Sequence, residues 1–175
     1  MRERAKQFAA EKHDGQTRKD GVTPYITHTV GVAAITRQYG GDEAQEAAAH
    51  LHDTIEDCDC TFDELVDTFG HAIAIMVQEL TNTSKIDRPD ANRAQRKAMD
   101  CEKLKGVSDR TKLVKLADIY YNVNDLKGLD RGFAVKFLEE KRIQAGVVRE
   151  GHEQLYVKII ESIDRNKERL LNNEF

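Results

Sequence analysis

Only two prolines, Pro24 and Pro89, interrupt this chain of 175 residues. Proline removes a backbone donor and clashes with the preceding turn of a helix, so its scarcity permits long helices. Apolar residues also recur at the spacing of a buried helix face, most clearly at Leu113, Leu116, Ala117, Tyr120 and Val123. No alternating pattern of useful length indicates a strand. We therefore predict an all-α fold, a compact helical bundle.

Glycines and capping residues suggest where the helices begin and end. We expect helices over residues 2–12, 28–39, 43–52, 62–69, 71–80, 91–105 and 109–126, and two more up to the C-terminus. Asp42 is a predicted N-cap, and Thr61 with Glu64 matches the capping-box pattern. The polar segments 14–24 and 81–90 are expected to be loops. We predict one domain over residues 1–175, with its motifs in about 5–126 and C-terminal helices in 130–172.

Composition argues against several classes of protein. With 27 basic and 31 acidic residues the formal charge is -4, whereas nucleic-acid binders are usually basic. We therefore expect no DNA or RNA partner. No stretch approaches 18 apolar residues, so we expect no membrane span, and the first residues do not resemble a secretory signal. Three scattered cysteines predict reduced thiols in a cytoplasmic protein.

One short segment concentrates groups that can bind metal or move protons. The stretch from Ala48 to Asp57 places ionisable side chains directly after an apolar run. On a helix His52 and Glu56 would share a face, and Asp53 and Asp57 would share the neighbouring one. Imidazole suits Mn, Fe or Zn, and carboxylate oxygens suit Mg and Mn. The mixed set favours Mn or Fe.

Two further positions carry polar groups in apolar surroundings. Asp118 and Asn122 lie four residues apart on the helix predicted at 109–126. A buried carboxylate needs a cation, and the alternatives to a metal are an ion pair with Lys115 or a cap on a neighbouring helix. His28 starts a predicted helix, where a lone histidine is more often structural than a metal ligand.

The order of these residues resembles the ligand order of the HD superfamily of metal-dependent phosphohydrolases. Further motifs resemble the hydrolase domain of the RelA/SpoT family: GQTRKDG at 15–21, PYITH at 24–28, HDTIED at 52–57, FG at 69–70 and KLVKLADIYYN at 112–122. The resemblance runs from about Ala5 to Leu126. It implies a stand-alone hydrolase of the HD type, because no segment remains to build the synthetase half of the long family members.

The resemblance also implies an activity and a metal site. The activity is removal of the 3′-pyrophosphate from the guanosine alarmones ppGpp and pppGpp, which gives GDP or GTP and pyrophosphate. The implied cofactor is one Mn²⁺, with Fe, Zn or Mg also able to occupy the site. Its implied ligands are His28, His52, Asp53 and Asp118.

The remaining site residues follow from the same comparison and from their charges. By resemblance Glu56 and Asp57 are the catalytic pair of the pyrophosphohydrolases in this family. Two close carboxylates repel, so one of them tends to keep its proton. By resemblance Arg18 and Lys19 contact the nucleotide base. Asn122 lies one turn from Asp118, so we expect it to bind substrate. Lys85 belongs to a group of basic residues that would attract a phosphorylated substrate.

Departures from the family pattern leave other functions open. Thr29 follows His28 where the family usually has proline. On the helix after Asp118, small family members carry an arginine and a tyrosine that hold the nucleotide, and a loose alignment places Lys136 and Glu140 there. One alternative is therefore an HD-type phosphohydrolase of another nucleotide, such as NADPH or a nucleoside mono- or triphosphate. A non-catalytic HD-fold binding module is less favoured, because all four ligand positions are filled.

Overall fold

The computed structural model describes residues 1–172. Within these residues the chain forms helices and no strand, and the only extended pairing is an isolated bridge between Thr17 and Pro24. The elements are α1 (Arg2–Lys12), α2 (Ile26–Gln38), α3 (Glu43–Leu51), α4 (Thr54–Asp57), α5 (Phe62–Phe69), α6 (His71–Leu80), α7 (Ser84–Asp87), α8 (Arg93–Leu104), α9 (Asp109–Asn124), α10 (Arg131–Val147), the 3₁₀ helix η1 (Arg149–Gly151) and α11 (Glu153–Leu171). The all-α prediction is confirmed.

Helix capping explains several of the observed boundaries. The side chain of Asp42 accepts hydrogen bonds from the first turn of α3, and Gln45 completes the capping box by accepting from the Asp42 backbone. Thr61 caps α5 by accepting from the Glu64 backbone N–H. The predicted second half of that capping box is wrong, because the Glu64 carboxylate instead forms an ion pair with Lys12 at 2.9 Å.

Other boundaries also differ from the prediction, most by one or two residues. Helix α2 begins at Ile26, two residues before the predicted start. The segment 81–90 is not entirely loop, since α7 forms within it over Ser84–Asp87. Four residues make a single turn, which is too short to produce a periodic pattern in the sequence. Helix α9 stops at Asn124, because Asp125 leaves the helical conformation with φ -118° and ψ 78°.

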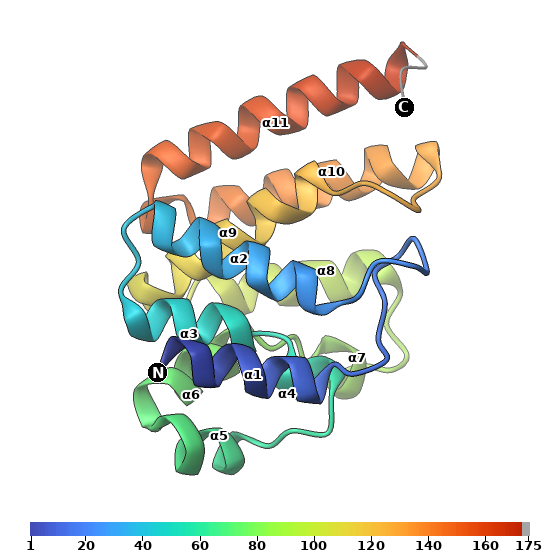
Figure 1. Cartoon of the computed structure of the whole chain (residues 1–175). Helices are drawn as coiled ribbons and strands as arrows, with labels where there is room; N and C mark the ends of the chain where they lie inside the picture. Colours follow the sequence, from blue (N-terminus) through green and yellow to red (C-terminus); the bar gives the residue numbers. More distant parts are fainter. Residues whose placement is uncertain (173–175) are drawn as a thin grey trace.

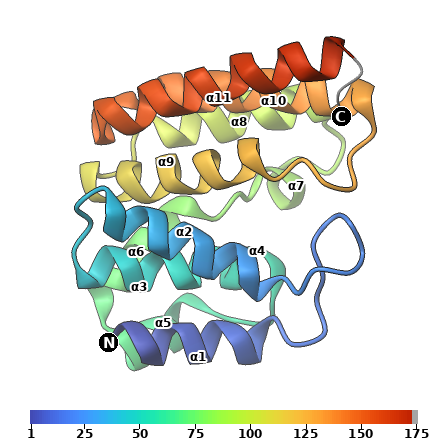
Figure 2. The same ribbon diagram turned by 45° about the horizontal axis from the view of Figure 1, so that its top comes forward.

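The helices lie in layers that run from α1 and α5 at one end of the molecule to α11 at the other (Figures 1 and 2). Helix α2 packs on α3 and on α9, and so it connects the two halves. One cluster of buried apolar residues joins α9, α10 and α11, with Leu116, Leu138 and Ile159 among its members. A second cluster joins α1, α3, α5 and α6, with Leu51 and Leu65 at its centre. No helix in the described part of the chain is long and apolar enough to cross a membrane.

The loop between α1 and α2 is fixed by local bonds and by one close approach. The Asp20 carboxylate accepts hydrogen bonds from the backbone N–H groups of Val22 and Thr23 and from the Thr23 hydroxyl. Gly128, with φ +75°, lies so close to the loop that a Cβ atom there would meet the Lys19 carbonyl oxygen at 2.5 Å. Only glycine fits this position without strain. The loop is thereby held against the segment that follows α9.

Candidate metal centre and active site

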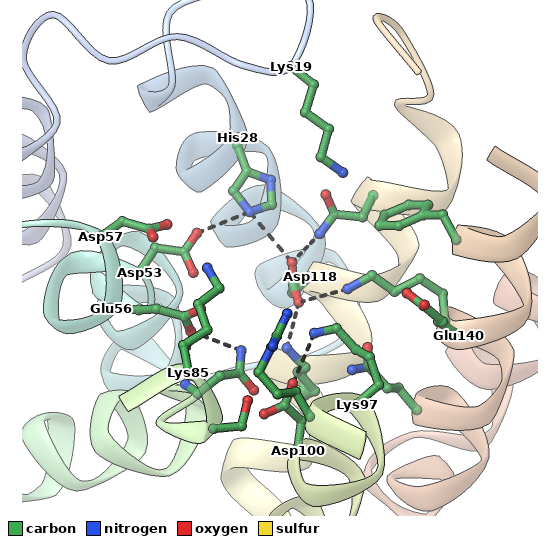
Figure 3. A pocket seen from close by; sticks show the side chains of 18 of the residues that line it. Lys19, His28, Asp53, Glu56, Asp57, Lys85, Lys97, Asp100, Asp118 and Glu140 are labelled. Atoms are coloured by element: carbon green, nitrogen blue, oxygen red, sulfur yellow. Dashed lines mark hydrogen bonds and ion pairs between the residues drawn. The ribbon is translucent and has the colours of Figure 1, made fainter. Parts of the chain in front are cut away.

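Four electron-rich side-chain atoms converge where α2, the α3–α4 turn and α9 meet, and three of the four residues are labelled in Figure 3. The atoms are His28 Nε2, His52 Nε2, Asp53 Oδ2 and Asp118 Oδ1. His28 Nε2 lies 3.2 Å from the His52 atom and 3.5 Å from each carboxylate oxygen. His52 Nε2 lies 3.0 Å from the Asp53 oxygen and 3.8 Å from that of Asp118.

The donor atoms of His28, His52 and Asp118 all lie within 4.8 Å of one another, so these three can share a divalent metal ion, and Asp53 Oδ2 lies beside the two imidazoles. Donors about 2.1 Å from one ion lie about 3.0 Å apart at a right angle and about 3.4 Å apart at the tetrahedral angle. His52 Nδ1 is 2.8 Å from the Ala49 carbonyl oxygen, which can only accept. One proton of this imidazole is therefore on Nδ1, and Nε2 faces the other three donor atoms.

The charges around these atoms also favour a cation. Burial lowers the pKa of His52, but the charges of Asp53 and Asp118 outweigh that effect and raise it to about 9. Burial lowers the pKa of His28, so this second imidazole tends to stay neutral. Transition metals bind neutral imidazoles and ionised carboxylates, so a bound cation would take the place of the second proton of His52. The donor set is therefore suited to a metal ion.

The His52–Asp53 dipeptide lies at a turn rather than inside a continuous helix. Helix α3 ends at Leu51 and α4 begins at Thr54, so no single helix carries His52 with Glu56 on one face and Asp53 with Asp57 on the neighbouring face, and that prediction is wrong. The turn instead directs both side chains to one point. Across the break, the Thr54 hydroxyl donates to the Leu51 carbonyl at 2.7 Å, and the Asp57 N–H donates to the Asp53 carbonyl at 2.8 Å.

Asp118 forms the ion pair with Lys115 that was considered from the sequence as an alternative to a metal. Its Oδ2 accepts a hydrogen bond from Lys115 Nζ at 2.9 Å, while Oδ1 faces the two imidazoles. Oδ1 also accepts a hydrogen bond from Asn122 Nδ2. The ion pair with Lys115 therefore holds the carboxylate in place and leaves one oxygen for a metal.

Glu56 and Asp57 lie beside the donor atoms, on the opposite side of the cavity from Glu140 (Figure 3). Burial raises the pKa of Glu56, and the Asp53 charge raises it further. The same two effects raise the pKa of Asp57. Both carboxyl groups therefore hold a proton to higher pH than exposed carboxyl groups do, which suits proton transfer near neutral pH.

Two residues that sequence reasoning missed contact these carboxylates. Glu56 Oε2 accepts hydrogen bonds from the backbone N and the Nδ2 of Asn82, at 2.8 and 2.9 Å. The Tyr25 hydroxyl donates to Asp53 Oδ2 at 2.6 Å, and it lies 3.4 Å from Asp57 Oδ2. The position of Tyr25, one turn before His28, was a signal for its role. Asn82 gave none, because it stands in a polar segment 26 residues from Glu56.

The predicted site residues surround one cavity of about 440 Å³. Nine of the ten line it, namely Arg18, Lys19, His28, Asp53, Glu56, Asp57, Lys85, Asp118 and Asn122. The tenth, His52, is fully buried and reaches the donor cluster through Nε2. Residues that are distant in sequence are thus close in space.

Arg18 is held rigidly at this cavity. Its Nη2 donates to Asn122 Oδ1 at 3.0 Å and to Asp125 Oδ2 at 3.2 Å. Its guanidinium carbon lies 5.5 Å from the ring centroid of Tyr25 and 5.7 Å from that of Tyr121. Asn122 therefore links Arg18 to Asp118, since it also donates to that carboxylate.

Helix α10 contributes a second wall of the cavity, and one of the two residues that the loose alignment named on this helix faces it. Lys136 is exposed and lies outside the cavity, whereas Glu140 lines it and forms an ion pair with Arg93 at 2.6 Å. Phe137 and Lys141, each one residue further along the helix, also line the cavity. Neighbouring helical residues point about 100° apart, so a shift of one position decides which side chains face inward.

Comparisons with known proteins place this geometry in a family. Residues 5–143 match the HD domain. Over 126 residues the chain is 44% identical to a protein of Xenopus tropicalis named guanosine-3′,5′-bis(diphosphate) 3′-pyrophosphohydrolase MESH1, covering 70% of this chain and 68% of that one. It is 42% identical over 125 residues to the human protein of that name, with 70% of this chain and 67% of that one covered.

Comparison with solved structures places the chain in the same family. A solved structure described as a metazoan ortholog of SpoT that hydrolyses ppGpp superposes with a TM-score of 0.83 at 29% sequence identity, and 94% of each chain is covered. The agreement extends over the helices beyond the matched HD segment. The chain therefore belongs to the HD-domain family, among the relatives of MESH1 and SpoT.

Proposed function

We propose that this protein is a metal-dependent hydrolase that removes the 3′-pyrophosphate group from ppGpp or pppGpp. The observation that carries the proposal is the pair Glu56 and Asp57, which lines the same cavity as the donor atoms and as Arg18. The names of the MESH1 relatives and the description of the SpoT ortholog support the same substrate.

The four donor residues His28, His52, Asp53 and Asp118 are proposed to hold one Mn²⁺ ion. Two imidazoles with two carboxylates are a donor set that suits Mn or Fe, and Zn or Mg could also occupy it. A bound ion supplies Lewis acidity, which lowers the pKa of water and offsets charge on phosphate oxygens.

The carboxylate pair is proposed to move the protons of the reaction. A water oxygen bonds to the phosphorus next to the 3′ oxygen, and the bond between that phosphorus and the 3′ oxygen breaks. One carboxylate accepts a proton from the water, and the 3′ oxygen takes up a proton as it leaves. Because burial raises the pKa of both Glu56 and Asp57, one can be ionised while the other is protonated.

Arg18 is proposed to bind the nucleotide base. Its guanidinium is already fixed between Asn122, Asp125 and two tyrosine rings, so little rotational freedom would be lost when a purine stacks on it. Lys19 Nζ lies 4.1 Å above the ring of Phe137, and burial lowers its pKa. Lys85 lines the cavity, and its charge partly offsets the rise that burial causes in the pKa of Asp57. It is the proposed phosphate contact on that side of the cavity.

The test is hydrolysis of ppGpp by the purified protein with Mn²⁺, with GDP and pyrophosphate measured separately. A chelator and the Asp53→Ala variant should each abolish both products. Asp67→Ala serves as the matched control, because Asp67 is exposed on α5 and lies outside the cavity. It should retain wild-type activity.

Each outcome has a defined meaning. Equal release of GDP and pyrophosphate, lost in Asp53→Ala but not in Asp67→Ala, supports the proposal. If ppGpp persists while the protein contains metal, the proposed substrate is wrong. NADPH and a panel of nucleoside mono- and triphosphates would then be tested with the same variants.

A further inference from the structure

The C-terminus of α6 leads into the active site, and a lysine from another helix holds it. Helix α6 ends at Leu80, and no basic residue stands in its last turn. The ammonium group of Lys103, on α8, donates hydrogen bonds to the carbonyl oxygen of Gln78, at 3.0 Å, and to that of Thr81. Carbonyl groups at the end of a helix lack partners within the helix, and a positive charge there is favourable. Lys103 therefore supplies a cap that α6 lacks in its own sequence.

One of these two carbonyl groups shares a peptide group with an N–H that contacts the active site. The Thr81 carbonyl carbon is bonded to the backbone nitrogen of Asn82, and the N–H of that nitrogen donates to Glu56 Oε2 at 2.8 Å. The peptide group is trans and planar, so its oxygen and its hydrogen lie on opposite sides. Lys103 and Glu56 therefore hold the two ends of one rigid unit.

The orientation of this peptide group is also fixed from the side of α6. The N–H and the hydroxyl of Thr81 both donate to the Val77 carbonyl, at 3.0 and 2.9 Å. Thr81 is buried, so water does not compete for these bonds. A hydrogen bond from a charged donor polarises the peptide group and strengthens the bond that its N–H makes. The charge of Lys103 therefore strengthens the hydrogen bond that Glu56 accepts.

Lys103 is placed where it can act on Glu56 without touching the substrate. It lines a second cavity of about 270 Å³, with Asp87 and Asp100 among the other lining residues, and not the cavity of the active site. Burial lowers the pKa of Lys103, and of the nearby carboxylates Glu56 opposes this effect most strongly. The two charges are thus coupled, although a peptide group lies between them.

We propose that Lys103 is a positioning residue for the hydrolysis: through the peptide group between Thr81 and Asn82 it holds the Glu56 carboxylate beside the metal donor atoms. The inference rests on the proposed function, in which the carboxylate pair moves the protons of the reaction. A group that transfers a proton must lie within hydrogen-bond reach of it, so a small displacement lowers the rate of the chemical step. It leaves substrate binding nearly unchanged, because Lys103 contacts no part of the substrate cavity.

The test measures ppGpp hydrolysis by Lys103→Met with Mn²⁺, together with hydrogen exchange of the Asn82 amide. The value of kcat should fall about tenfold, with KM and bound Mn²⁺ per chain within about twofold of wild type. Exchange of the Asn82 amide should become about tenfold faster, since the peptide group loses its fixed orientation. Lys105→Met is the matched control, because Lys105 follows α8 directly and its side chain is 62% exposed, and it should behave as wild type does.

Two further variants separate positioning from a purely structural role. Lys103→Arg should recover most of the lost kcat, because a guanidinium group also carries a charge and can donate to both carbonyl groups. In a Glu56→Gln background, Lys103→Met should not lower the residual kcat further, since both changes act on the same carboxylate. If Lys103→Met does not fold, as judged by circular dichroism, Lys103→Gln takes its place, since it loses the charge and keeps a donor.

The proposal is overturned if kcat of Lys103→Met stays within about twofold of wild type, or if exchange of the Asn82 amide is unchanged. It is also overturned if kcat falls together with bound Mn²⁺, or if KM rises more than kcat falls. Either pattern would show a general disturbance of the cavity rather than a displaced Glu56.

The outcome can be separated from that of the proposed function. If wild type does not hydrolyse ppGpp, the proposed function fails, and the exchange rate of the Asn82 amide then decides whether Lys103 holds the partner of Glu56. If wild type hydrolyses ppGpp while Lys103→Met keeps its kcat and its Asn82 exchange rate, the positioning role is overturned and the proposed function stands.

Discussion

Substitution of Gly31 by alanine tests whether close helix packing positions His28. A Cβ atom at Gly31 on α2 would lie 2.1 Å from Cε2 and 2.4 Å from Cδ2 of Tyr121 on α9. Carbon atoms normally pack about 3.5–4.0 Å apart, so the helices must separate or the ring must rotate. The ring centroid lies 4.9 Å from that of the His28 imidazole, so either movement disturbs a predicted metal ligand.

The expected magnitude follows from two opposing effects. Alanine is favoured over glycine inside a helix by about 1 kcal/mol. Overpacking in a close contact costs about 1–3 kcal/mol. Gly146→Ala is the matched control, because Gly146 lies inside α10 and a Cβ atom there meets nothing within 4 Å. The control should be stabilised, and Gly31→Ala should be less stable than the control by about 1–3 kcal/mol.

Urea denaturation of wild type and both variants, at constant m-value, measures this difference. In the double variant Gly31→Ala, Tyr121→Ala the loss of stability should be smaller than the sum of the losses in the two single variants, since the ring that the new methyl group meets is gone. If Gly31→Ala is as stable as Gly146→Ala, the close packing of α2 on α9 is not a constraint. The same result would show that His28 does not depend on this contact.

Three further predictions concern the site. Asn82→Ala removes the side-chain hydrogen bond to Glu56 and leaves the one from the backbone. The kcat for ppGpp should therefore fall about 10- to 100-fold with little change in KM. An unchanged kcat would show that Asn82 does not position Glu56. Burial and the Asp57 carboxylate raise the pKa of Cys58 to about 11. Because only the thiolate reacts, alkylation of Cys58 in the folded protein at pH 8 should be about 100-fold slower than alkylation of a free cysteine. The rate of alkylation should rise about tenfold per pH unit below pH 11. An alkylation rate equal to that of free cysteine would refute the raised pKa of Cys58. Removal of a metal that is present at 100 times its Kd should lower the free energy of unfolding by about 2.7 kcal/mol, so a chelator should lower the midpoint of thermal unfolding. An unchanged midpoint would mean that the donor atoms bind no metal.

Most of the fold could be predicted because its signals are local. The scarcity of proline and the cap at Asp42 each act within a few residues of their position. The second half of the expected capping box at Thr61 failed because Lys12, distant in sequence, attracts the Glu64 carboxylate. The single turn of α7 was missed because so short a helix has no periodicity.

The candidate site could be predicted in part for the same reason. His28, His52, Asp53 and Asp118 stand in short motifs whose order resembles a known family, and the structure brings their donor atoms together. Asn82 carries no such motif and reaches Glu56 only through the tertiary fold.

Of the two residues named on α10, only Glu140 faces the cavity. A loop between residues 125 and 130 precedes this helix, and its length cannot be inferred from a loose alignment. Lys136 was therefore named, although Phe137 and Lys141 line the cavity beside Glu140 and Lys136 does not.

The division of the cavity between helices bears on how such a protein can evolve. All four predicted metal ligands come from α2, the α3–α4 turn and α9, and α10 supplies none of them. Substitutions on the inner face of α10 therefore leave the donor atoms in place. A gene duplicate can acquire a new substrate through changes on this one helix while it keeps its hydrolytic chemistry. Paralogues with unchanged HD motifs and a divergent α10 are then expected to differ in the nucleotide they cleave.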